Sequence, residues 1–60
     1  MSNLSQVELS SIRECVGGHV TTAHKLNDYA QKCTDPQIKQ MFTKAATDAM
    51  NAAQKLAGML

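Results

Sequence analysis

A helix begins within the stretch Cys33-Thr34-Asp35-Pro36-Gln37-Ile38, and this start divides the chain into two parts. Thr34 is the predicted N-cap, and Gln37 stands three residues later, where its side chain can return the hydrogen bond of a capping box. Pro36 is tolerated because the first turn of a helix does not need its missing N–H. If Asp35 is the cap instead, Pro36 takes the first helical position and the same helix is predicted.

A similar signal stands near the beginning of the chain, in Leu4-Ser5-Gln6-Val7-Glu8-Leu9. Ser5 is the predicted N-cap and Glu8 completes a capping box, with a leucine on either side as a hydrophobic staple. The two starts predict an all-α protein. Its first helix covers about residues 5–33 and its second about 35–58.

Apolar residues recur through both predicted helices at the spacing of one helix face. In the first helix they are Leu9, Ile12, Val16, His19, Val20, Ala23, Leu26, Ala30 and Cys33, where His19 is the one polar member. In the second they are Ile38, Phe42, Ala45, Ala49, Ala52, Leu56 and Met59, widened by Met41, Ala46, Ala53 and Leu60. The first pattern keeps its phase through Gly17-Gly18, which favours a continuous helix; a break there would instead give three helices.

The short turn between the helices predicts an antiparallel hairpin, in which facing residues have numbers that sum to about 71 or 72. Large side chains then mostly face small ones, as Leu26 faces Ala45 and Phe42 faces Ala30. A lone hairpin would leave exposed a flanking stripe made of Val20, Tyr29, Met41, Ala46 and Ala53. We therefore expect two chains to form a four-helix bundle. The predicted interface residues are Val16, His19, Val20, Met41, Phe42, Ala46, Ala49, Ala53 and Leu56.

Length and charge restrict what such a chain can do. Its 60 residues, 6.5 kDa in all, make a single domain over 1–60 that is too small for an enzyme with a deep pocket of its own. A net charge of +1 with interspersed signs predicts no nucleic-acid partner. The first residues do not resemble a secretory signal and no apolar run approaches a membrane span, so we expect a cytoplasmic protein without a membrane partner.

Histidine supplies the sharpest alternative, a helical bundle that binds a metal ion or haem between two copies of His19. His24 and Asp28 are four residues apart and form a weaker candidate pair of metal ligands. No carboxylate cage of the di-metal bundle type can be drawn, because neither glutamate is followed by a histidine three residues later. The expectation is therefore a histidine at the edge of the core and no cofactor.

The two cysteines, Cys15 and Cys33, are eighteen residues apart, which is roughly 27 Å along a continuous helix, so they cannot pair within it. Cys33 is expected to be a small apolar residue of the seam. Cys15 leaves open a weaker alternative, a redox-sensitive dimer in which the thiol meets its twin.

The chain resembles the small ferritin-like two-helix proteins related to spore coat protein F of endospore-forming bacteria. The resemblance covers nearly the whole length and depends on four segments. They are Leu4-Ser5-Gln6-x-Glu8-Leu9-Ser10, Lys25-Leu26-x-x-Tyr29-Ala30, Thr34-Asp35-Pro36-Gln37-Ile38-Lys39-Gln40 and the ending from Leu56 to Leu60. It implies hairpins that are halves of a ferritin-like bundle, an association with sporulation, and no well-established enzymatic activity. It also implies the spore coat as a location and other coat proteins as partners.

Overall fold

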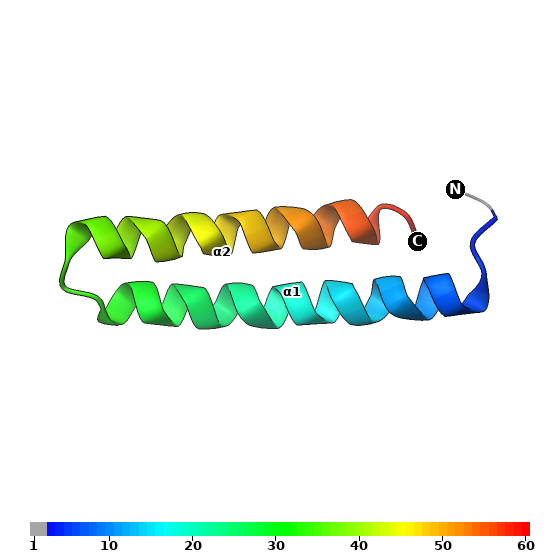
Figure 1. The fold of residues 1–60 in the computed structure, drawn as a ribbon, viewed down its shortest axis with the longest axis horizontal. Coiled ribbons are helices and arrows are strands. Elements are labelled where there is room, and N and C mark those ends of the chain that lie inside the picture. Colours follow the sequence, from blue (N-terminus) through cyan, green and yellow to red (C-terminus); the bar gives the residue numbers. More distant parts are fainter. Residues whose placement is uncertain (1–2) are drawn as a thin grey trace.

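The computed structural model describes residues 3–60 and contains two helices, α1 over Gln6–Lys32 and α2 over Pro36–Ala57. Met1 and Ser2, which belong to the predicted 1–60 domain, lie outside the described residues. The helices run antiparallel beside each other, with the turn at one end and both chain ends at the other (Figure 1). The Cα atoms span 47 × 14 × 9 Å, so the hairpin is two helices wide and one helix thick.

The capping box predicted for α1 is confirmed. The Ser5 hydroxyl accepts a hydrogen bond from the Glu8 N–H at 3.1 Å, and the Ser5 N–H donates to Glu8 Oε1 at 2.9 Å. The bond from the Ser5 N–H holds the pKa of the Glu8 carboxyl below its usual value. Because that pKa is lowered in the folded chain, the charged cap stabilises α1 at neutral pH and weakens as the pH falls through the lowered value.

The turn differs from the first expectation at one residue. Asp35, not Thr34, is the N-cap of α2, and its carboxylate accepts from the N–H groups of Gln37 at 2.8 Å and Ile38 at 3.2 Å. The physical reason is Pro36, whose fixed φ suits the first helical position, so the cap must stand directly before it.

This cap can be tested with a matched pair of substitutions. Asp35→Ala should lower the free energy of unfolding by about 1 kcal/mol, because two N–H groups at the start of α2 lose their acceptor. Thr34→Ala should change it by much less, since the Thr34 side chain caps nothing. The two values come from urea unfolding followed by circular dichroism. Equal losses for both variants, or a larger loss for Thr34→Ala, would contradict the cap.

α1 continues without interruption through Gly17 and Gly18, as the unbroken seam predicts. Neither glycine has a positive φ, and a methyl group built on either one would have no neighbour within 4 Å. Both glycines therefore lie on open helix surface of the hairpin, so the alternative with three helices is wrong.

Candidate interaction surface

The two helices meet along a line of alanines. Ala23 and Ala30 of α1 are 1% and 5% exposed, and Ala46 and Ala53 of α2 are each 3% exposed. Each pair is seven residues apart, which is about two helical turns, so each forms one row along its helix. Among residues 3–60 these four are the buried hydrophobic residues, and no large side chain is fully buried.

An aromatic pair shows which side of this line carries the wider apolar surface. The rings of Tyr29 and Phe42 lie 5.6 Å apart between centroids and are tilted by 57°. Their numbers sum to 71, in agreement with the predicted register. At 100° per residue, Leu26 and Cys33 lie between the alanine row of α1 and Tyr29, and therefore on the same side of the hairpin as this pair.

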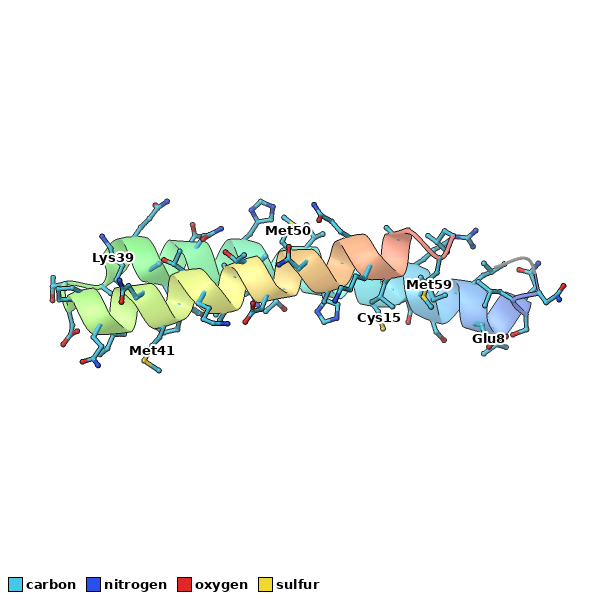
Figure 2. The ribbon with its side chains drawn as sticks, turned by 90° about the horizontal axis from the view of Figure 1, so that it is seen from above. Glu8, Cys15, Lys39, Met41, Met50 and Met59 are labelled. Atoms are coloured by element: carbon cyan, nitrogen blue, oxygen red, sulfur yellow. The ribbon has the colours of Figure 1, made fainter. Side chains whose placement is uncertain are left out.

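We use the name apolar face for the rows that flank the alanines on that side. Most of its side chains are half-buried, but Ile38 remains 46% exposed and Met59 36%. The face comprises Ile12, His19 and Leu26 of α1 and Cys33 just after it, with Ile38, Phe42, Ala45, Ala49, Ala52 and Leu56 of α2 and Met59 just after it. Met41, 68% exposed, borders it, and Figure 2 shows Met41 and Cys15 pointing away from one side of the hairpin.

The opposite side of the hairpin is less apolar. Figure 2 shows Met50 and Lys39 on that side of α2. Met50 is half-buried, as are Val16 and Val20 of α1, whereas Lys39 is exposed. This side therefore offers a narrow apolar strip beside charged and polar residues.

Part of the predicted flanking stripe is wrong. Ala46 and Ala53 were expected to remain exposed at its margin, but they lie at the centre of the contact between the helices. Val20 and Tyr29 are nine residues apart, or 180° around α1, so they cannot belong to one stripe. The assignment of interface residues between copies remains a prediction, and the structure adds to its candidates Leu26, Ala45 and Ala52, which continue the same face.

The candidate metal ligands do not come together within one hairpin. His19 is half-buried on the apolar face, while His24 and Asp28 are exposed. Five residues, or 140° around the helix, separate the two histidines. In the part of the chain that the structure describes, no three His, Cys, Asp or Glu side chains gather to hold a metal ion, and no pocket forms. A histidine-based site would thus have to be completed by another copy.

Both cysteines are free thiols, Cys15 exposed and Cys33 half-buried. Among residues 3–60 there is one ion pair, between Lys44 Nζ and Asp48 Oδ2 at 2.9 Å, and both of its side chains are largely exposed. Such an exposed pair contributes at most a fraction of a kcal/mol, so charge does little to hold this hairpin together.

Comparisons with known proteins return no match among family models, curated proteins or solved structures. The resemblance to the spore coat protein F family therefore depends on the quoted residues alone. Over the described residues, neither helix is long and apolar enough to span a membrane.

Proposed function

We propose that this protein is a non-enzymatic structural and interaction module whose apolar face pairs with a second copy to form a four-helix bundle. The observation that carries the proposal is that the core of the hairpin contains no fully buried large side chain among residues 3–60. Four alanines are buried, whereas Ile12, Leu26, Phe42 and Leu56 are all only half-buried. A second apolar face would complete the burial of these larger side chains, each of which gains roughly 1.5–3 kcal/mol when fully removed from water.

The accessible area of the hairpin supports the same proposal. The chain exposes 4597 Å². A compact monomer of its 6.5 kDa mass would expose about 3,800 Å² by the usual scaling of area with mass. The difference is about 800 Å², which is the area that one partner buries in a standard protein–protein interface. The area to be covered thus agrees with a partner of similar size, and a second copy satisfies this requirement.

Self-association makes stability depend on concentration, and this dependence tests the proposal. We expect the Tm, measured by circular dichroism from the low micromolar to the millimolar range, to rise with protein concentration because the associated state is favoured by mass action. A constant Tm over that range, with full helicity throughout, would contradict it.

The resemblance to the spore coat protein F family supports a place for this bundle in the spore coat, alongside other coat proteins. The most specific segment is Asp35-Pro36-Gln37-Ile38 after the Tyr29-Ala30 end of α1. In this role the abundance of the protein should rise as the cells that encode it sporulate. Equal abundance in growing cells would contradict the role in the spore coat, while the proposed self-associating module would be unaffected.

A further inference from the structure

We propose that the two copies stack face to face with their interhelical turns at the same end of the bundle, so that α1 of one copy lies over α2 of the other. This inference rests on the proposed self-association. Two stackings are compatible with a twofold axis: one has the turns together, and the other has them at opposite ends. The sizes of the side chains along the apolar face distinguish the two.

The apolar face carries larger side chains on α1 than on α2 through its middle. A twofold axis parallel to the helices keeps every residue at its own level, so facing residues in the two copies obey the same register as within one hairpin. Leu26 of one copy then meets Ala45 of the other, and His19 meets Ala52. Large side chains thus meet small ones in the middle of both contacts between the copies, which is the condition for close packing there, whereas Ile12 meets Met59 near the end that holds the chain termini.

The opposite stacking lays each helix on its own equivalent. With the face centred near Ala49, Phe42 of one copy meets Leu56 of the other, while Ala45 meets Ala52. In the middle of the bundle only alanines would meet between the two α2 helices, whereas the larger side chains of Leu26 and His19 would meet between the two α1 helices. The large side chains would keep the α1 helices apart and leave gaps between the alanines of the α2 helices, so this stacking packs less well.

A pair of spin labels measures the orientation directly. We would place a nitroxide on Thr34→Cys in a Cys15→Ala, Cys33→Ala background, after confirming helicity and mass, and measure distances by double electron–electron resonance. With helix axes about 8–10 Å apart, the two turns of a same-end bundle lie within about 20 Å of each other before the label arms are added. In the opposite stacking they are separated by about the full length of the hairpin, 47 Å.

Asn51→Cys in the same background is the control, because this exposed position lies near the middle of the hairpin, and in either stacking its distance is set by the width of the bundle and stays well below 47 Å. A distance of bundle width at 51 with one near 47 Å at 34 would overturn the orientation and leave the proposed self-association standing. A monomer mass with no dipolar signal at either site would overturn both. If the background does not fold, p-acetylphenylalanine at position 34, labelled through its ketone, gives the same measurement with both native cysteines kept.

Discussion

Phe42→Asp is expected to abolish the associated state and to cost several kcal/mol of stability. Phe42 lies at the junction of two contacts: its ring packs on Tyr29 within the hairpin, and its remaining exposed edge belongs to the apolar face. A carboxylate at this position would be desolvated without a partner in the bundle, and the aromatic contact would be lost as well. We expect light scattering to show loss of the associated species, and circular dichroism to show a large loss of helix at the same concentration.

The matched control is Gln40→Asp, which adds the same charge to the same region of α2 at an exposed position away from the apolar face. It should keep the mass and the helicity of the unmodified protein. If Phe42→Asp retained both the mass and the Tm of the parent, Phe42 would be neither in the helix contact nor in the proposed interface.

The double substitution Gly17→Ala with Gly18→Ala is expected to stabilise the protein by up to ~2 kcal/mol, because each glycine in a helix interior costs about 1 kcal/mol relative to alanine. The space around both residues allows this, since an added methyl group at either one meets nothing within 4 Å. Thermal and urea unfolding at a fixed protein concentration measure the gain, and the oligomeric state should be retained.

The single variants distinguish an effect on helix propensity from an effect on the contact between two copies. Gly17 lies on the side of α1 opposite the Leu26 row of the apolar face, so Gly17→Ala reports helix propensity alone. Gly18 lies 140° around α1 from Ala23. It is four residues before Thr22, which is itself four residues before Leu26, so Gly18 is nearer than Gly17 to the edge of the apolar face where a second copy would approach. A gain from Gly17→Ala with a loss from Gly18→Ala would indicate close backbone contact there, whereas losses from both would contradict open surface at these glycines.

Local signals in the sequence were sufficient for the elements and their pairing. The Ser5 capping box and the turn before Pro36 place both helices to within one residue, because caps satisfy N–H groups through neighbours close in the chain. The short turn then requires an antiparallel hairpin, and the contact between Tyr29 and Phe42 has the predicted register.

The line of closest contact could not be predicted in the same way. The apolar arc of α2 extends from Met41 around to Met50, which is wider than one neighbouring helix can cover, so spacing alone does not say which row faces α1. The helices approach each other along the row with the smallest side chains, Ala46 and Ala53, and this choice depends on packing between elements. For Tyr29 the expected exposure is confirmed, since the residue is 49% exposed even though its ring packs on Phe42.

The mass of the folded protein in dilute solution is the most direct test of self-association through the apolar face. Sedimentation equilibrium, combined with circular dichroism on the same samples, should give a helical species of at least twice the 6.5 kDa chain mass. The mass should fall toward that of one chain only as helicity is lost on dilution. A fully helical species of 6.5 kDa at every concentration would contradict the account, because the half-buried side chains of the hairpin would then be stable without a partner.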